Sequence, residues 1–355
     1  VRVWVPRGKG RSAAHTRDVA ARFLSHYRSY FGAPYPWRKL DLVAVLNARS
    51  SAFNEAGVIL LDAGRTLVDP DTPAGEQAWP TRLVATGIAH QWFGGLVSIA
   101  GWDDFWLIQA FPTWAGIRGT QGAYTSERAW ALWADCLQSA WPLSVDTPNW
   151  VAGSYMRLAS EKGAAVLHML ASYLGDEAFR KGLQRYLQDH AFGNATSDDL
   201  WKAMEEASGV PGAALGRPWV KQSGYPVVEL VPNADGQLVV TQKPFCVSGP
   251  APDPSALWQV PLRLRAVVPG GQEKQPAPEV RLLTARQQTI APPAGGLEQS
   301  LLANAGAIGY YLVHYTREQL LALLPHIQAD LEPAERDDLF AGQWRLTQAG
   351  VASIY

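Results

Sequence analysis

Residues 83–94 read LVATGIAHQWFG, and residues 102–111 read WDDFWLIQAF. The spacing of apolar residues over 81–94 predicts a helix, and a second helix is predicted from the other stretch. His90 belongs to the first, and Gln109 follows it nineteen residues later in the second. These two stretches are the centre of the functional argument.

The two stretches resemble the aminopeptidase N-type gluzincins, a family of zinc metallo-aminopeptidases. Their pattern is H-E-x-x-H-x-W-F-G followed by W-x-x-x-W-L-N-E-G-F, with a Glu ligand nineteen residues after the second His. The resemblance implies that His90 is the second ligand and that Gln109 replaces the Glu ligand. It also implies that Thr86 stands at the first ligand position and Gly87 at the position of the general base.

The chemistry of such a site explains why these substitutions matter. Two His residues four apart share one helical face and hold the metal, and the Glu beside the first His takes a proton from metal-bound water. Thr86 and Gln109 offer only neutral oxygens, and Gly87 offers no side chain. A lone imidazole does not hold zinc against water, whereas complete four-ligand sites bind with about 10–16 kcal/mol. His90 is then either the one retained ligand or a packed core histidine.

A stretch upstream bears on substrate binding. The family carries a G-A-M-E-N strand whose Glu binds the amino group of the substrate, and residues 51–59 (SAFNEAGVI) align with it. Asn54 takes the Glu position, and the acid follows one residue later as Glu55. Because side chains alternate along a strand, Glu55 serves as the anchor only if a bulge re-aims it; otherwise it is solvated or structurally paired.

A stretch downstream bears on the oxyanion. The resemblance implies a Y-x-K-G motif whose Tyr stabilises the tetrahedral intermediate, but residues 160–163 read SEKG, so Ser160 replaces the Tyr. The serine hydroxyl is too short to reach the same point, and loss of such a donor typically costs about 10²–10³ in rate. A serine that caps the following helix is a sufficient structural explanation.

Hydrophobic periodicity and turn residues predict the remaining elements. Strands are expected over residues 1–5, 40–46 and 57–61. Helices are expected over residues 17–31, 160–174, 176–188 and 197–207, with Ser197 as the N-cap of the last. Pro112 is expected to be tolerated if the second helix begins near Leu107, because a proline close to the start of a helix gives up no intrahelical hydrogen bond. A small antiparallel module is expected over residues 227–230, 238–242, 257–267, 280–283 and 310–314, and helices over residues 318–324 and 333–350.

The fold class that follows is α+β. The resemblance implies a thermolysin-like, mainly helical catalytic-type domain over residues 1–225. It further implies a small β-sandwich domain over residues 226–315 and the start of a truncated C-terminal helical domain over residues 316–355. We therefore expect an excised fragment that lacks the family's N-terminal β domain.

Composition limits the class of partner. The 31 basic and 32 acidic residues nearly cancel, so we expect no nucleic acid partner. No apolar run approaches the roughly 20 residues that cross a bilayer, so no membrane segment is expected in this chain. Cys136 and Cys246 form no ligand cluster and are expected to be free thiols. The compartment stays open.

Tryptophan is abundant, with 15 residues. Several lie close to the two decisive helices, where large rings fill a core or line an aromatic pocket. Core packing is the favoured interpretation for Trp92, Trp102, Trp106 and Trp114.

Taken together, these substitutions predict an aminopeptidase N-family homologue with a degraded zinc site. The expected role is that of a non-catalytic pseudo-peptidase that binds a peptide or protein partner or acts as a scaffold, without a cofactor. The alternative is an active zinc metallo-aminopeptidase that releases N-terminal residues from peptides with a rearranged site. Replacing Thr86 by His, Gly87 by Glu and Gln109 by Glu is expected to restore zinc affinity.

Overall fold

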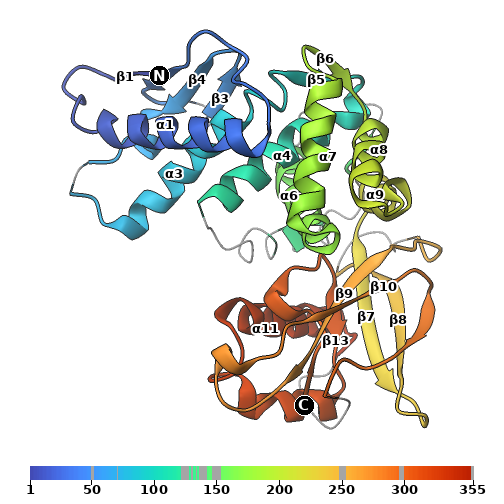
Figure 1. Cartoon of the computed structure of the whole chain (residues 1–355). Coiled ribbons are helices and arrows are strands. Elements are labelled where there is room, and N and C mark those ends of the chain that lie inside the picture. The colour runs from blue at the N-terminus through green and yellow to red at the C-terminus, as the bar shows by residue number, and fades with distance from the viewer. Residues whose placement is uncertain are drawn as a thin grey trace. The chain divides into compact units, whose positions relative to one another are not determined.

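The computed structural model describes residues 1–48, 52–69, 71–120, 128, 131–132, 134–135, 142–145, 153–247, 253–295 and 300–352. The chain divides into two compact units, which are described separately (Figure 1). Val1–Gly122 and Leu174–Gly212 make up most of the first unit. The second contains Ala213–Tyr355 and the long helix α6 (Gly153–Leu174), whose last residue belongs to the first unit. Helices combine with several small sheets, so the mixed α and β content expected from the sequence is confirmed.

The first unit opens with a mixed sheet of strand order β1-β2-β4-β3. Its strands are β1 (Arg2–Trp4), β2 (Asp41–Val45), β3 (Ala52–Glu55) and β4 (Val58–Asp62). The first, second and fourth of these run parallel, and β3 is antiparallel to β4. Leu42 and Ile59 are fully buried partners on neighbouring strands, so one face of the sheet belongs to the core.

Helices pack around this sheet and around each other. They are α1 (Ala13–Tyr30), α2 (Ala63–Thr66), α3 (Ala74–Ala89), α4 (Phe105–Gly119), α7 (Asp176–Asp189) and α8 (Ser197–Ser208). The short strands β5 (Val97–Ile99) and β6 (Gly193–Ala195) pair in parallel. Trp92, Trp106 and Trp114 are at most 1% exposed, which confirms core packing for these three. Trp102 is 57% exposed in a 3-10 turn before α4, so the same expectation was wrong for it.

The second unit combines α6 and α9 (Gly212–Lys221) with small sheets and two later helices. One sheet has the order β11-β8-β7-β13 and another the order β10-β9-β12. The strands are β7 (Tyr225–Pro232), β8 (Leu238–Phe245), β9 (Val260–Val267), β10 (Glu279–Leu283), β11 (Gln287–Ile290), β12 (Ser300–Leu302) and β13 (Leu312–His314). The sequence predicts a purely antiparallel module, but β13 runs parallel to β7, so this prediction was wrong for β13. The helices α10 (Arg317–Leu323) and α11 (Pro333–Gln348) follow.

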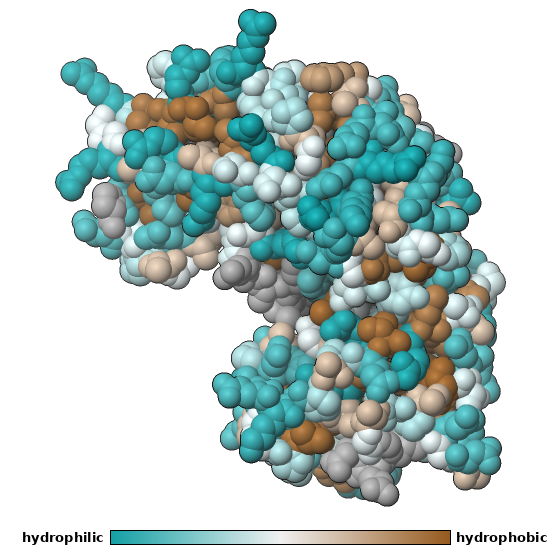
Figure 2. Space-filling model, viewed as in Figure 1, coloured by the Kyte–Doolittle hydropathy of each residue, from teal (hydrophilic) through white to brown (hydrophobic). Residues whose placement is uncertain are grey.

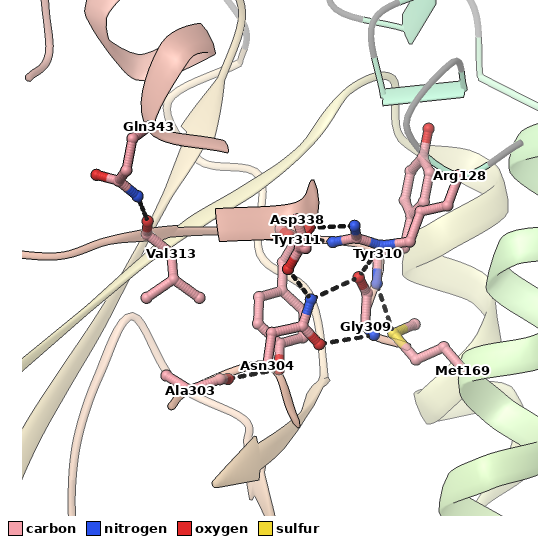
Figure 3. Close-up of polar contacts among 10 residues, drawn as sticks. All are labelled: Arg128, Met169, Ala303, Asn304, Gly309, Tyr310, Tyr311, Val313, Asp338 and Gln343. Atoms are coloured by element: carbon pink, nitrogen blue, oxygen red, sulfur yellow. Dashed lines mark hydrogen bonds and ion pairs between the residues drawn. The ribbon is translucent and has the colours of Figure 1, made fainter. Parts of the chain in front are cut away.

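A buried polar network holds α11 against the segment before β13 (Figure 3). The Arg128 guanidinium donates to Asp338 of α11 and to the carbonyls of Gly309 and Tyr311. Asn304 donates to the other oxygen of Asp338 at 2.8 Å and accepts from the Gly309 N–H at 2.9 Å. A buried charge costs little when it is paired and hydrogen-bonded in this way, so the network is structural.

Three local predictions need correction. Helix α3 begins at Ala74, before the predicted start at 81, and ends at Ala89, because the residues that follow turn back toward Val97. Helix α4 begins at Phe105, so Pro112 lies in its interior and not in its first turn. Thr196, and not Ser197, caps α8: its hydroxyl accepts from the Asp199 N–H, and the Asp199 carboxylate accepts from the Thr196 N–H.

The surface mixes polar and apolar residues. On the face drawn in Figure 2, brown hydrophobic areas are interrupted by teal hydrophilic ones. Within the part of the chain that the structure describes, no helix is long and apolar enough to span a membrane. Cys246 is half-buried just after β8, and Cys136 lies outside the described residues.

Candidate functional site

Three of the predicted site residues, Thr86, Gly87 and His90, lie at the C-terminal end of α3. His90 is the C-cap residue of this helix, and its N–H donates to the Thr86 carbonyl at 3.1 Å. The residue keeps some exposed surface, but its ring is densely surrounded by protein. This burial lowers the pKa of His90 to about 4, and a hydrogen bond with the Phe93 backbone opposes the shift. The imidazole is therefore neutral at pH 7, as a metal ligand or a packed core histidine would be.

Gly87 lies where the resemblance implies a general base, and the space beside it is filled. A Cβ atom added there would lie 2.8 Å from Asn54 Oδ1 and 3.1 and 3.3 Å from two methyl carbons of Ile59. Contacts below about 3.4 Å at a Cβ are repulsive, because carbon atoms pack best at about 3.5–4.0 Å. The structure therefore leaves no ready space for a side chain at position 87.

Thr86 makes a second tight contact, with Gly116 of α4. A Cβ atom added at Gly116 would overlap Thr86 Oγ1 and would lie 3.2 and 3.3 Å from the Thr86 backbone N and Cα. The backbones of α3 and α4 thus approach closely at this point, which only glycine permits. Thr86 fills the gap between the two helices with its own hydroxyl.

Strand β3 decides where Asn54 and Glu55 point. Its pairing with β4 is regular, with Asn54 opposite Ile59 and Glu55 opposite Val58, and contains no bulge. Asn54 therefore faces α3, and Glu55 is exposed on the other side. The Asn54 Oδ1 atom is buried and has no hydrogen-bond partner among the described residues.

Gln91 is a residue that the sequence argument passed over. It is 1% exposed, and its amide accepts from the Gly57 N–H at 2.9 Å and donates to the Glu55 carbonyl at 3.0 Å. It thereby holds the β3–β4 turn against the end of α3 and fixes the strand that carries Asn54. The signal available in the sequence was a single amide between apolar residues next to His90.

Gln109 lies half-buried on α4, the helix that packs on α3. Its backbone carbonyl accepts a hydrogen bond from Thr113 Oγ1 at 2.8 Å. The side chain carries a neutral amide where the resemblance implies a carboxylate ligand, so it adds no charge to the region.

Ser160 belongs to the second unit and lies in the middle of α6. Its hydroxyl donates to the Met156 carbonyl at 2.9 Å, four residues back along the helix. The expectation that Ser160 caps a helix was therefore wrong, because α6 already begins at Gly153. Two residues on, Lys162 forms a fully buried ion pair with Asp135 at 3.0 Å and donates to the Gly224 carbonyl.

The donor set does not match a zinc site. Thr86, His90 and Gln109 supply one imidazole and two neutral oxygens, whereas zinc sites use thiolates, imidazoles and carboxylates. Within the described ranges, no group of three or more His, Cys, Asp or Glu residues is placed to hold a metal ion. The crowding beside Gly87 points the same way, since a side chain at the position that the resemblance implies for the base would press on Asn54 and Ile59.

Comparisons with known proteins identify the family of the chain. Residues 15–219 match the peptidase family M1 domain. The chain is 31% identical to aminopeptidase M1-A of Oryza sativa subsp. japonica, over 99% of this chain and 41% of that protein. It is 33% identical to Tricorn protease-interacting factor F2 of Thermoplasma volcanium, over 70% of this chain and 33% of that protein. It is 29% identical to the puromycin-sensitive aminopeptidase of Caenorhabditis elegans, over 100% of this chain and 39% of that protein. The chain thus spans about two fifths or less of the length of these relatives.

Proposed function

This chain belongs to the peptidase M1 family, and we propose that it is a member whose metal site has been lost. In this proposal it is a non-catalytic pseudo-peptidase that binds a peptide or protein partner or acts as a scaffold within a longer polypeptide. Thr86 and Gln109 occupy two former ligand positions, Gly87 the position of the general base, and His90 is the one retained donor. Among the positions that bind substrate or intermediate, Asn54 has lost the anchoring carboxylate.

The observation that carries the proposal is the donor set at positions 86, 87, 90 and 109, in which the His90 imidazole is the one group that zinc sites ordinarily use. The crowding beside Gly87 supports it, since Asn54 and Ile59 lie within 2.8–3.3 Å of where a Cβ at position 87 would lie. Loss of a general base alone typically forfeits about 10²–10⁴ in rate. Without an activated metal-bound water there is no proton for such a base to take.

The remaining losses support the same proposal. Glu55, the acid nearest to the amine-anchor position, is exposed on a strand without a bulge. Ser160, at the position of the oxyanion tyrosine, donates back into its own helix. Neither side chain is therefore placed as the resemblance would require for substrate binding or catalysis.

The partner and the domain layout belong to the proposal as well. One relative is named Tricorn protease-interacting factor F2, and that name motivates a protein partner for this chain. The proposed layout keeps a thermolysin-like catalytic-type domain over residues 1–225 and a β-sandwich over residues 226–315. The start of a helical domain over residues 316–355 completes it.

An active zinc metallo-aminopeptidase is the second candidate, because relatives are named aminopeptidase M1-A and puromycin-sensitive aminopeptidase. It requires His90, Gln109 and a further acid to meet around a metal, with zinc as cofactor. The exposure of Glu55 counts against that acid being Glu55.

Metal analysis separates the two candidates. We expect purified chain at known concentration to contain far less than one zinc per molecule and to leave aminoacyl arylamides intact. The His90→Ala variant serves as the control and should match the unsubstituted chain in both measurements. About one zinc per chain, lost in His90→Ala, together with chelator-sensitive hydrolysis would establish the active enzyme instead.

A further inference from the structure

We propose that packing has closed the former metal site, so that restoring the metal donors alone does not restore metal binding. Two contacts centred on glycine close it: Asn54 and Ile59 against Gly87, and Thr86 against Gly116. The inference rests on the proposed function but concerns the space around the donors and not their number. It reverses the sequence-based expectation that three substitutions rebuild the site.

The first contact lies between α3 and the edge of the sheet. Any side chain at position 87 begins with a Cβ 2.8 Å from Asn54 Oδ1 and 3.1 Å from the nearest Ile59 methyl. The Asn54 amide can rotate away at modest cost. Ile59 is held more firmly, because it is fully buried on β4, between Leu42 of β2 and Asn54 of β3. A glutamate at 87 therefore requires this core residue to shift by a few tenths of an ångström.

The second contact lies between α3 and α4. Thr86 already touches the α4 backbone at Gly116, within 3.2–3.3 Å of a Cβ position there. A histidine at 86 starts from the same Cβ, and helical backbone leaves it two favoured χ1 rotamers. Its ring, much larger than a threonine hydroxyl, has to find room at this close helix crossing. The first ligand position is thus crowded by the backbone of the helix that carries Gln109.

The proposed loss of the amine anchor at position 54 and that of the general base at position 87 are linked, because the Asn54 side chain lies beside Gly87. Asn54 stands at the amine-anchor position and projects into the space that the base would use. Its Oδ1 atom is buried and without a hydrogen-bond partner among the described residues, so trimming Asn54 to alanine removes no hydrogen bond at that atom. This makes Asn54→Ala a clean way to reopen the space.

A double-mutant cycle on folding stability tests the first contact without any measurement of activity. Gly→Ala at an open helical position stabilises a helix. Gly75, near the start of the same helix, has nothing within 4 Å of its Cβ position and serves as the matched control. We expect Gly75→Ala to leave the thermal midpoint unchanged or higher, and Gly87→Ala to lower it.

Asn54→Ala should then restore part of the loss in the Gly87→Ala background, because it removes the nearest contact and leaves those with Ile59, so that the two substitutions are not additive. A midpoint for Gly87→Ala as high as that for Gly75→Ala, or strictly additive effects, would overturn the proposal. The midpoints and their additivity are measured without reference to zinc. The zinc content of the unsubstituted chain tests the proposed function separately.

Metal uptake tests the consequence. The variant carrying Thr86→His, Gly87→Glu and Gln109→Glu should show a lowered thermal midpoint and bind less than a tenth of an equivalent of zinc at micromolar metal. One equivalent of zinc bound with an unchanged midpoint would show that the space is open and the proposal wrong. A purified unsubstituted chain that already holds zinc would instead refute the proposed function.

Discussion

A single buried amide organises the surroundings of Gly87. Gln91 spans the β3–β4 turn by accepting from the Gly57 N–H and donating to the Glu55 carbonyl. Glu55 is the last residue of β3 and Gly57 lies in the turn, so the amide ties both to the end of α3. The position of Asn54 against α3 therefore depends on Gln91 as well as on the pairing of β3 with β4.

Replacing Gln91 by Leu keeps the volume and removes these two hydrogen bonds together with a longer one that Gln91 accepts from the Tyr35 hydroxyl at 3.5 Å. We expect the free energy of unfolding to fall by about 1–3 kcal/mol, because the Gly57 N–H is left buried without a partner. Urea unfolding of the full chain measures the change. The exposed Gln188 of α7 gives the control, and Gln188→Leu should shift stability by less than about 0.5 kcal/mol. Equal effects of the two substitutions would contradict the role given to Gln91.

At the scale of elements, one carboxylate secures the connection between α10 and α11. Asp330 accepts from His326 at 2.7 Å and from the backbone N–H groups of Gly271 and Gly270 at 2.7 and 3.1 Å. These bonds, first the one from His326 and then the one from Gly271, hold the pKa of Asp330 below its ordinary value, although burial opposes them. The connector is thereby tied to the turn that follows β9.

The direction of this pKa shift predicts a pH dependence. A carboxyl whose pKa is lower in the folded chain stabilises the fold above its unfolded pKa of about 3.9, and that stability is lost as the pH falls through the folded pKa. The difference in unfolding free energy between the unsubstituted chain and Asp330→Asn should therefore shrink between about pH 4 and pH 2. Urea unfolding at several pH values measures it.

The exposed Asp235 in the β7–β8 turn provides the comparison for that experiment. Asp235→Asn should change stability little at any pH, since its carboxylate lies in solvent. If the effect of Asp330→Asn were the same at pH 6 and pH 2, the assigned hydrogen bonds would not be what lowers its pKa.

Elements with strong local patterns were predicted well. Helices α7 and α8 and strands β2 and β4 lie within a residue or two of their predicted ranges, because each combines clear periodicity with a clear start or stop. Local sequence signals gave the wrong N-cap where a contact with a residue far along the chain determines the role of a side chain. Ser197 looks like a cap, but its hydroxyl and N–H bond Asp104, 93 residues away, and Thr196 takes the capping role.

At the scale of the whole molecule, the proposed loss of the metal site has a thermodynamic signature. Any ligand that binds only the folded chain raises its stability, by about 2.7 kcal/mol at a concentration 100 times its Kd. We expect neither added zinc nor a chelator to move the thermal midpoint of the full chain. The His90→Ala variant should behave identically. A rise with zinc that His90→Ala abolishes would contradict the proposed function.

The sequence by itself determined the family, because the residues around His90 and Gln109 and the chain on either side carry the family's pattern. It also motivated the proposal about which metal donors are missing, since a side chain's chemistry can be read without coordinates. Only the tertiary structure shows how much space the packing leaves for new metal donors at positions 86 and 87. Asn54 meets Gly87 from 33 residues away, and Thr86 meets Gly116 from 30. Such contacts arise from packing between elements and leave no periodic trace in the sequence.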